Sequence, residues 1–270
     1  AYGSALLSNR LTGKRALITG SSRGIGLGIA TGLAKLDAAV VLHARSRDAA
    51  EAAVDELRRA VPGAEVSAVA GDLGSSESAE SAFQGAGNID ILVNNAGVFD
   101  GASAFELDDD AWRRMFEINV FGAVRAIRHF GPKMSANGWG RIVNISSEAG
   151  SAPVTELIHY SASKAALNSV SRGFAQALMG TGVTVNTVIV GPTEHENATE
   201  SRKTRAADAG ISYEEYQRRF FAEHRPTALI ARYVKVEEIA ALVGFIVSEE
   251  AGFVTGAPWR ADCGSLTSIS

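Results

Sequence analysis

Apolar residues fall into short runs that alternate along the chain with longer segments of helical periodicity. The short runs are hydrophobic at nearly every position rather than at every second one, which is typical of parallel strands buried on both faces. We expect strands at Arg15–Thr19, Ala39–His43, Glu65–Ala70, Ile89–Asn94, Arg141–Ser146, Val183–Val190 and Ala257–Ala261.

Between these runs, hydrophobic residues recur at every third or fourth position, which predicts helices. The predicted helices are Ile25–Leu36, Asp48–Ala60, Glu77–Gln84, Asp109–Met134, Thr155–Gly180 and Val236–Val247. Regular alternation of strand and helix predicts an α/β fold, a Rossmann-type doubly wound parallel sheet of about seven strands with right-handed crossovers. No Pro- or Ser-rich linker divides the chain, so we expect one domain over residues 1–270.

One long polar interruption, Glu194–Arg225, separates the sixth predicted strand from the last long helix. It carries many charges and includes a helical stretch at Tyr213–Glu223. A solvated surface insertion is one interpretation. Because the segment follows the carboxyl end of a strand, where α/β sheets bind their ligands, we favour a substrate lid at about residues 193–226.

Composition excludes several functional classes. Hydrophobic residues make up 46% and charged residues 21%, as in ordinary globular proteins. A formal net charge of −4 leaves no strong basic field for nucleic acid or an anionic membrane. The single cysteine excludes an intrachain disulfide, the histidines lack zinc-motif spacing, and the longest apolar stretch, Ala240–Val247, is too short to span a bilayer. We expect a cytoplasmic protein without a metal.

A glycine-rich loop, Thr19–Gly26, lies between the first predicted strand and the first predicted helix. Glycines permit a sharp turn and a close approach of the backbone to a phosphate. The free N–H groups of the following helix favour an anion at the same place. In the first βαβ unit, this arrangement predicts a dinucleotide site.

Further motifs follow in a characteristic order. The glycine loop reads TGxxxGxG, Asn94-Asn95-Ala96-Gly97 ends the fourth strand, and Ser147 lies thirteen residues before Tyr160 in Tyr160-Ser161-Ala162-Ser163-Lys164. With Asp72 after the third strand and Asn119 in the fourth helix, the chain resembles the classical short-chain dehydrogenase/reductase family over nearly its whole length. The resemblance implies an oxidoreductase with catalytic residues Asn119, Ser147, Tyr160 and Lys164. It implies a cofactor site at Gly20, Ser22, Arg23, Gly24, Ile25, Gly26, Arg45, Asp72, Leu73, Asn95, Ala96, Gly97, Tyr160, Lys164, Gly191 and Thr193.

The residues after the second strand indicate which nicotinamide cofactor binds. An acidic residue there would bond a free ribose 2′-hydroxyl and repel a 2′-phosphate, but the position holds Ala44. Arg45 follows it, and Arg23 lies in the glycine loop. Guanidinium groups bind phosphate in a bidentate manner, so we expect NADP(H) rather than NAD(H).

Tyr160 and Lys164 are four residues apart in a segment of helical periodicity, which places them on one helix face. We expect the ammonium of Lys164 to lower the pKa of the Tyr160 phenol, so that it can exchange a proton near neutral pH. Ser147 would hold the substrate oxygen, and Asn119 would support Lys164 through water. This set predicts the reduction of a carbonyl, and the same residues serve the reverse oxidation.

Departures from the family pattern occur after the sixth strand. Val190-Gly191 stands where a Pro-Gly pair is common, and Glu194-His195-Glu196 stands where many members have a further Thr. Thr193 would still reach the nicotinamide carboxamide. We interpret His195 as a residue of a solvated loop rather than as a metal ligand.

The expected substrate is a small carbonyl or alcohol compound. Val154, Leu157 and Val190 suggest an apolar cleft, and the likeness is closest to the 3-oxoacyl-[acyl-carrier-protein] reductase type, so an acyl thioester is one candidate. Alternatives are an alcohol dehydrogenase working in the oxidative direction and a regulatory NADP(H) sensor without catalysis, although a sensor would not need the four catalytic residues. The resemblance also implies a homotetramer.

Overall fold

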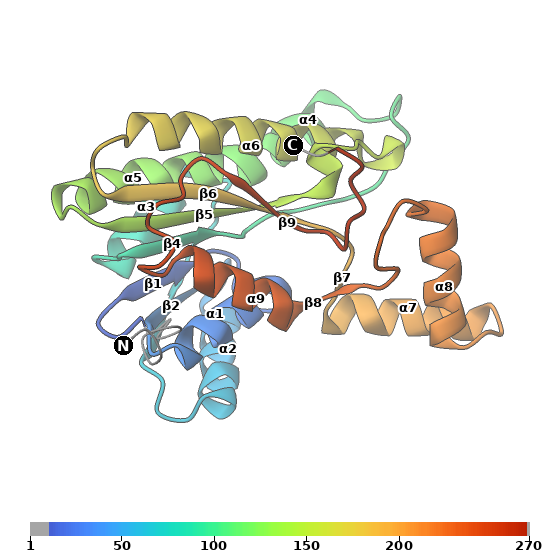
Figure 1. The fold of residues 1–270 in the computed structure, drawn as a ribbon, viewed down its shortest axis with the longest axis horizontal. Coiled ribbons are helices and arrows are strands. Elements are labelled where there is room, and N and C mark those ends of the chain that lie inside the picture. Colours follow the sequence, from blue (N-terminus) through green and yellow to red (C-terminus); the bar gives the residue numbers. More distant parts are fainter. Residues whose placement is uncertain (1–10, 269–270) are drawn as a thin grey trace, which may run out of the picture.

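The central feature of the computed structural model, which describes residues 11–268, is a parallel β-sheet (Figure 1). Its strand order is β3-β2-β1-β4-β5-β6-β9, and every neighbouring pair is parallel. The strands are β1 (Arg15–Ile18), β2 (Ala39–Ala44), β3 (Val66–Ala70), β4 (Ile91–Asn94), β5 (Gly140–Ser147), β6 (Val183–Val190) and β9 (Pro258–Ala261). All seven predicted strands are therefore confirmed, with bounds shifted by at most two residues.

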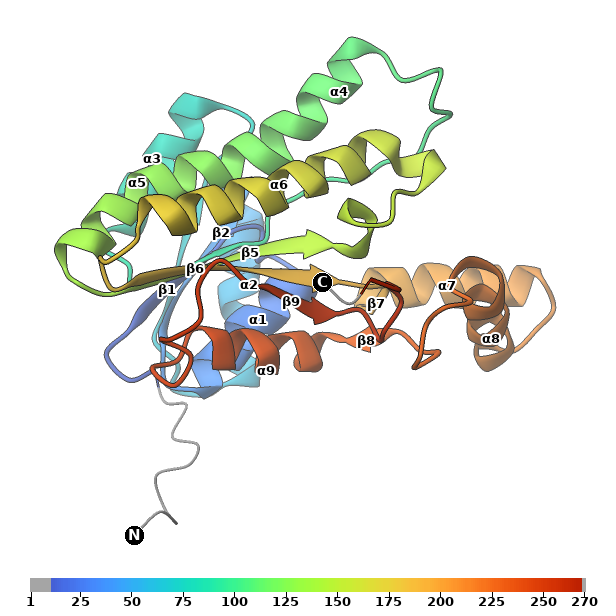
Figure 2. The same cartoon turned by 45° about the horizontal axis from the view of Figure 1, so that its top comes forward.

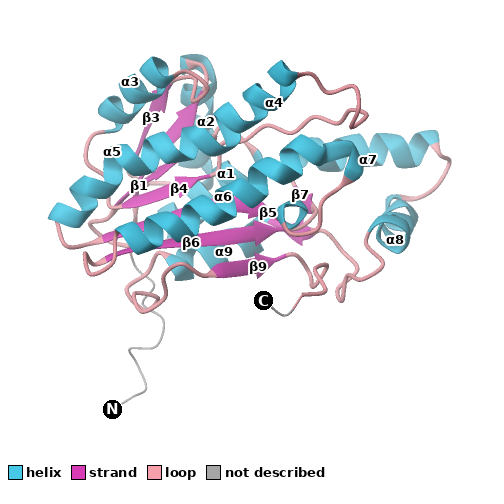
Figure 3. Cartoon of the chain, turned by 90° about the horizontal axis from the view of Figure 1, so that it is seen from above, coloured by secondary structure: helices cyan, strands magenta, loops and turns pink. Residues whose placement is uncertain are grey.

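Helices cover both faces of the sheet and make two hydrophobic cores. On one face lie α1 (Gly24–Lys35), α2 (Arg47–Ala60) and α9 (Val236–Ile246), whose side chains share one core cluster with the strands. On the other face lie α3 (Ser76–Ala86), α5 (Gly122–Ala136) and α6 (Ile158–Ala177) (Figure 3). Side chains of Phe83, Phe130 and Ile142 belong to the second core, on this side. The single-domain doubly wound fold is the predicted one.

The segment predicted as one helix over Asp109–Met134 is instead interrupted. It contains α4 (Asp109–Phe116), a π-helical turn η1 (Glu117–Phe121) and then α5. A π turn holds one extra residue per turn without ending the helix, so the periodicity of hydrophobic residues hardly reveals it. The predicted helix over Thr155–Gly180 begins with the 3₁₀ turn η3 (Thr155–Leu157) and ends at Ala177.

The polar interruption forms a structured insertion segment, residues 193–235. It consists of β7 (Thr193–Glu194), α7 (Glu196–Asp208), α8 (Tyr213–His224) and β8 (Val234–Lys235), and its two short strands pair in parallel. α7 and α8 lie beyond the ends of β5, β6 and β9 (Figure 2). α7 was not predicted, because its sequence is polar on every side.

The carboxyl ends of the strands meet at the edge from which the insertion segment extends. The strand order reverses between β1 and β4, since β1 connects outward to β2 and β4 connects outward to β5. Open α/β sheets bind ligands at such a switch point. Within residues 11–268, no helix combines the length and the apolar character needed to cross a bilayer.

Candidate active site

The glycine loop connects β1 to α1 through contacts that only glycine allows. Gly20 and Gly24 have positive φ angles of 62° and 59°. A Cβ on Gly20 would lie 2.7 Å from the Cα of Ala96, and one on Gly26 would lie 2.5 Å from the carbonyl oxygen of Gly20. Both distances are shorter than real contacts, so an alanine would not fit at either position without a shift of the backbone.

Two buried polar side chains, those of His43 and Ser21, hold the glycine loop in place. The imidazole Nδ1 of His43 accepts a hydrogen bond from the Gly20 N–H at 3.1 Å, and its Nε2 lies 3.1 Å from the carbonyl oxygen of Gly71. The Ser21 hydroxyl donates to the Ile18 carbonyl at 2.7 Å and accepts from the His43 N–H at 2.9 Å. Burial lowers the pKa of His43 to about 4, so the ring is neutral at physiological pH.

The side chain of Asn95, which follows β4, also holds the glycine loop in place. Its amide nitrogen donates to the carbonyl oxygens of Thr19 and Gly20, each at 3.0 Å. Asn94 instead donates to Asn144 on the neighbouring strand at 2.8 Å and so joins β4 to β5. Sequence reasoning missed Ser21 and His43, although a histidine within an apolar strand is a visible signal of a specific polar role.

Features around the loop suit a diphosphate. α1 begins with an extended N-cap residue, Arg23, that makes no side-chain cap, and its first turn contains no acidic residue. Its N–H groups therefore face the loop without a competing carboxylate. Arg23 is exposed at this point, and Arg45 is exposed just beyond β2. Both lie where the sequence predicted contacts with a phosphorylated ribose.

His195 does not lie in a solvated loop, contrary to expectation. Its ring packs against the glycine loop, with Cγ and Nδ1 each 3.8 Å from the position that a Cβ on Gly24 would take. Burial lowers the pKa of His195, and the charges of Arg202 and Arg23 lower it further. The part of the chain that the structure describes holds no group of His, Cys, Asp and Glu suited to a metal ion.

Asp72 and Leu73, two of the predicted cofactor-site residues, differ in character. Asp72 is exposed after β3, and its carboxylate accepts a hydrogen bond from the Gly74 N–H at 2.9 Å. The Leu73 side chain is 4% exposed and belongs to the second hydrophobic core. The side chain of Leu73 is therefore not available to a ligand.

The structure brings Lys164 and Tyr160 together on α6. Lys164 Nζ lies 5.7 Å from the centre of the Tyr160 ring and donates to the Ile145 carbonyl oxygen at 3.0 Å. Burial lowers the pKa of Lys164 to about 8. Gly97 lies beside this group, since a Cβ there would be 3.6 Å from Nζ.

The pKa of Tyr160 is raised, not lowered as the sequence suggested. Burial is the largest cause, the negative charge of Glu148 adds to it, and the Ser147 side chain opposes both. The Lys164 ammonium group is directed to the Ile145 carbonyl oxygen. Burial thus favours the protonated phenol, the form that gives a proton.

Ser147 lies at the carboxyl end of β5, beside Tyr160. Its hydroxyl accepts a hydrogen bond from the Ala149 N–H at 3.2 Å and so caps a 3₁₀ turn, η2 (Glu148–Gly150). The hydroxyl proton remains available for a second oxygen, because accepting one hydrogen bond leaves the donor free.

Asn119 lies in the π-helical turn η1 and clamps the loop after β4. Its amide accepts from the Val98 N–H at 2.8 Å and donates to the Val98 carbonyl at 2.9 Å, and it also donates to Ser163 Oγ at 3.0 Å. Among the described residues, no direct hydrogen bond joins Asn119 to Lys164. The two side chains flank Gly97, where a Cβ would lie 3.3 Å from Asn119 Oδ1.

Gly191 and Thr193 form the turn after β6. The Gly191 N–H donates to the Ala261 carbonyl at 3.0 Å, and the Thr193 hydroxyl donates to the Gly191 carbonyl at 2.9 Å. The Val190-Gly191 departure therefore preserves a tight turn. The Thr193 hydroxyl is directed to the turn itself.

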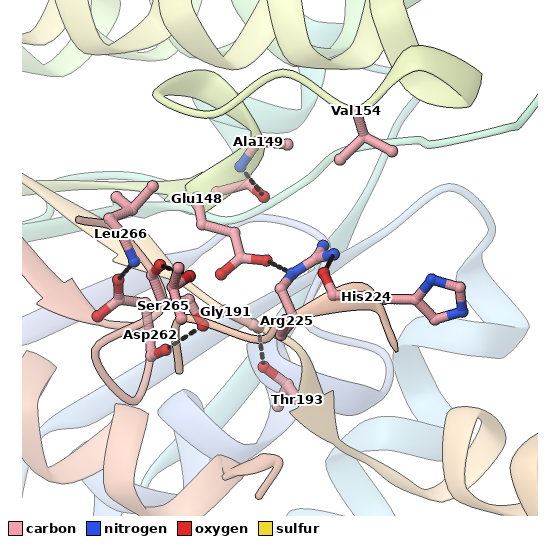
Figure 4. A network of polar contacts seen from close by, with 12 residues as sticks. Glu148, Ala149, Val154, Gly191, Thr193, His224, Arg225, Asp262, Ser265 and Leu266 are labelled. Atoms are coloured by element: carbon pink, nitrogen blue, oxygen red, sulfur yellow. Dashed lines mark hydrogen bonds and ion pairs between the residues drawn. The ribbon is translucent and has the colours of Figure 1, made fainter. Parts of the chain in front are cut away.

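A charged pair that sequence reasoning missed borders the site (Figure 4). Glu148, the residue after Ser147, pairs with the guanidinium of Arg225, which follows α8 in the insertion segment. The Glu148 side chain is only 7% exposed. The acidic residue directly after Ser147 could have been noticed in the sequence. Its partner is remote in sequence, and only the fold brings the two side chains together.

Comparisons with known proteins agree with this arrangement. A family model described as short chain dehydrogenase matches residues 14–206. The oxidoreductase YvaG of Bacillus subtilis (strain 168) is 39% identical over 259 residues, covering 96% of this chain and 98% of YvaG. The 3-oxoacyl-[acyl-carrier-protein] reductase FabG of Aquifex aeolicus is 33% identical, and the match covers 92% of this chain and 95% of the FabG chain.

A solved structure of a reductase has the same fold as this chain. L-sorbose reductase from Gluconobacter frateurii, complexed with NADPH and L-sorbose, superimposes with a TM-score of 0.90 and 32% sequence identity. The match covers 97% of this chain and 100% of the reductase. With these matches and the Ser147, Tyr160 and Lys164 constellation at the carboxyl edge of the sheet, the chain belongs to the short-chain dehydrogenase/reductase family of oxidoreductases, which act on CH–OH or carbonyl groups.

Proposed function

We propose that this protein reduces a ketone to a secondary alcohol with NADPH and that Tyr160 supplies the proton. The observation that carries the proposal is the convergence of Tyr160, Lys164 and Ser147 beside the glycine loop. Tyr160 and Lys164 share one face of α6, and Ser147 ends the neighbouring strand β5.

The glycine loop presents backbone N–H groups beside the N-terminus of α1, where the diphosphate of a dinucleotide would bind. Arg23 and Arg45 would bind the 2′-phosphate, and Ala44 leaves no carboxylate to repel it. When bound, the reduced nicotinamide supplies the hydride. L-sorbose reductase binds NADPH on the same fold, which supports the preference for the phosphorylated cofactor.

The side chains around the substrate oxygen then stabilise its developing charge and supply its proton. Ser147 donates a hydrogen bond to the oxygen and stabilises the negative charge that develops on it. Tyr160 transfers its proton to that oxygen, and its raised pKa keeps the proton in place until then. Lys164 holds positive charge near the phenolate that results, and Asn119 maintains the neighbouring loop.

Three further features belong to the same proposal. The insertion segment acts as a substrate lid, because it lies over the carboxyl edge of the sheet. The protein works as a cytoplasmic homotetramer, as the family resemblance implies. A 3-oxoacyl thioester is a reasonable first substrate, since the FabG relative is a 3-oxoacyl-[acyl-carrier-protein] reductase.

The test is NADPH consumption with a panel of ketones that includes an acetoacetyl thioester and 3-hydroxybutan-2-one, run beside NADH. Tyr160→Phe should abolish turnover and retain NADPH binding by calorimetry. Tyr216→Phe, which removes a phenol in α8 outside the site, should keep both. Turnover that survives in Tyr160→Phe would refute the assignment of the proton donor. NADPH binding without turnover of any ketone would support a sensor instead.

A further inference from the structure

Glu148 is a buried carboxylate at the border of the site that the mechanism does not use. It follows Ser147 directly, and its negative charge raises the pKa of Tyr160, so it lies close to the phenol. The side chain extends from the turn after β5 toward Arg225 and the loop of Gly191 and Thr193 (Figure 4).

Only one of its two oxygens has a partner. Oε1 accepts from Nε of Arg225, whereas Oε2 is fully buried and has no hydrogen-bond partner among the described residues. Arg225 directs its NH1 group to the His224 carbonyl at 2.7 Å. A buried carboxylate oxygen without a donor costs free energy, so the site favours any molecule that brings a donor to it.

The surroundings define which donor fits. Ala149 and Val154 offer no polar side chain on their side of Glu148 (Figure 4). An anionic ketoacid would place a second negative charge near the carboxylate, with one guanidinium already engaged. A plain ketone or the acyl chain of a thioester would leave Oε2 unpaired. A neutral hydroxyl group donates one hydrogen bond and adds no charge.

We propose that Glu148 determines specificity and that the substrate is an uncharged hydroxyketone, whose hydroxyl group donates to the free oxygen of Glu148. Arg225 is a positioning residue, because its guanidinium bonds the carboxylate and fixes its orientation from the insertion segment. This inference rests on the proposed ketone reduction and names its substrate class.

A matched pair of ketones tests the idea. 3-Hydroxybutan-2-one and butan-2-one differ by a single hydroxyl group. With NADPH, the wild-type protein should show a kcat/KM at least about tenfold higher for the hydroxyketone, since sites built to bond a hydroxyl reject analogues that lack it. Glu148→Leu should bring that ratio near one, through loss on the hydroxyketone and little change on butan-2-one.

Two further variants separate specificity from folding. Glu148→Gln keeps the shape of the side chain and removes its charge, so the ratio should fall several-fold even if the leucine variant does not fold. Arg225→Gln should raise KM for the hydroxyketone more than it lowers kcat, because the carboxylate remains but loses its orientation. Glu223→Gln, an exposed carboxylate on α8, should leave the ratio unchanged.

The outcomes are distinct. If the protein reduces ketones but does not prefer the hydroxyketone, or if the preference survives in both Glu148 variants, the inference is wrong and Glu148 only ties the insertion segment to β5. If neither ketone nor the acetoacetyl thioester is reduced, the proposed function fails together with it.

Discussion

Mild acid should destabilise this protein through His43, the buried imidazole beneath the glycine loop. Its pKa in the folded state is about 4, against a usual value of 6.5, because burial disfavours the charged ring. Protonation would also convert Nδ1 from an acceptor into a donor and break the bond from the Gly20 N–H.

The sign and the size follow from linkage. The unfolded chain takes up the proton near pH 6.5, whereas the folded protein resists it until about pH 4. The stabilisation is therefore present above pH 6.5 and is lost as the pH falls toward 4. At about pH 5 the loss should be roughly 2 kcal/mol, rising to roughly 3 kcal/mol below pH 4.

Urea denaturation of the wild-type protein and His43→Asn, at about pH 8 and about pH 5, measures this quantity. Asparagine retains an acceptor for the Gly20 N–H but does not titrate. Whatever its absolute stability, the variant should lose about 2 kcal/mol less than the wild type between the two pH values. His224→Asn, which removes an exposed histidine, should keep the wild-type pH dependence. An equal loss in wild type and His43→Asn would refute the reasoning.

Three other changes test separate parts of the site. Gly26→Ala places a Cβ 2.5 Å from a backbone oxygen of the glycine loop and should cost about 1–3 kcal/mol in thermal unfolding, whereas Gly173→Ala, with nothing within 4 Å, should be neutral or stabilising. Arg45→Gln should weaken NADPH binding about tenfold by calorimetry with little effect on NADH, and Arg59→Gln on α2 should change neither. Because the pKa of Lys164 is about 8, kcat/KM for reduction should fall as the pH rises above 8; a flat profile there would contradict a role for its charge.

Sequence patterns were sufficient for the strands because each is a short run of mainly apolar residues that is followed by a polar or glycine residue. They were insufficient for α7, whose charged residues show no apolar face, since its place depends on β7 and on Arg202 bonding the Thr193 carbonyl. Tyr160 and Lys164 lie on one helix, α6, as their spacing of four residues indicated, and Ser147 ends β5.

Long-range electrostatics could not be predicted in the same way. The sequence suggested that Lys164 controls the pKa of Tyr160, because four residues separate them on one helix. In the folded protein, burial and the charge of Glu148 raise that pKa, and the Glu148–Arg225 pair joins residues 77 positions apart. Such a contact depends on the path that the insertion segment takes relative to β5. No local sequence pattern predicts that path.

Because of the π-helical turn Glu117–Phe121, the structure is sensitive to any change in the number of residues in this helix. Deleting one residue there would restore regular α-helical winding and turn everything on one side by about 100° relative to the other, since a helix advances that much per residue. Asn119 would then rotate away from Val98, and the loop after β4 would lose its clamp. The region should therefore tolerate point substitutions on its outer surface far better than insertions or deletions of a single residue.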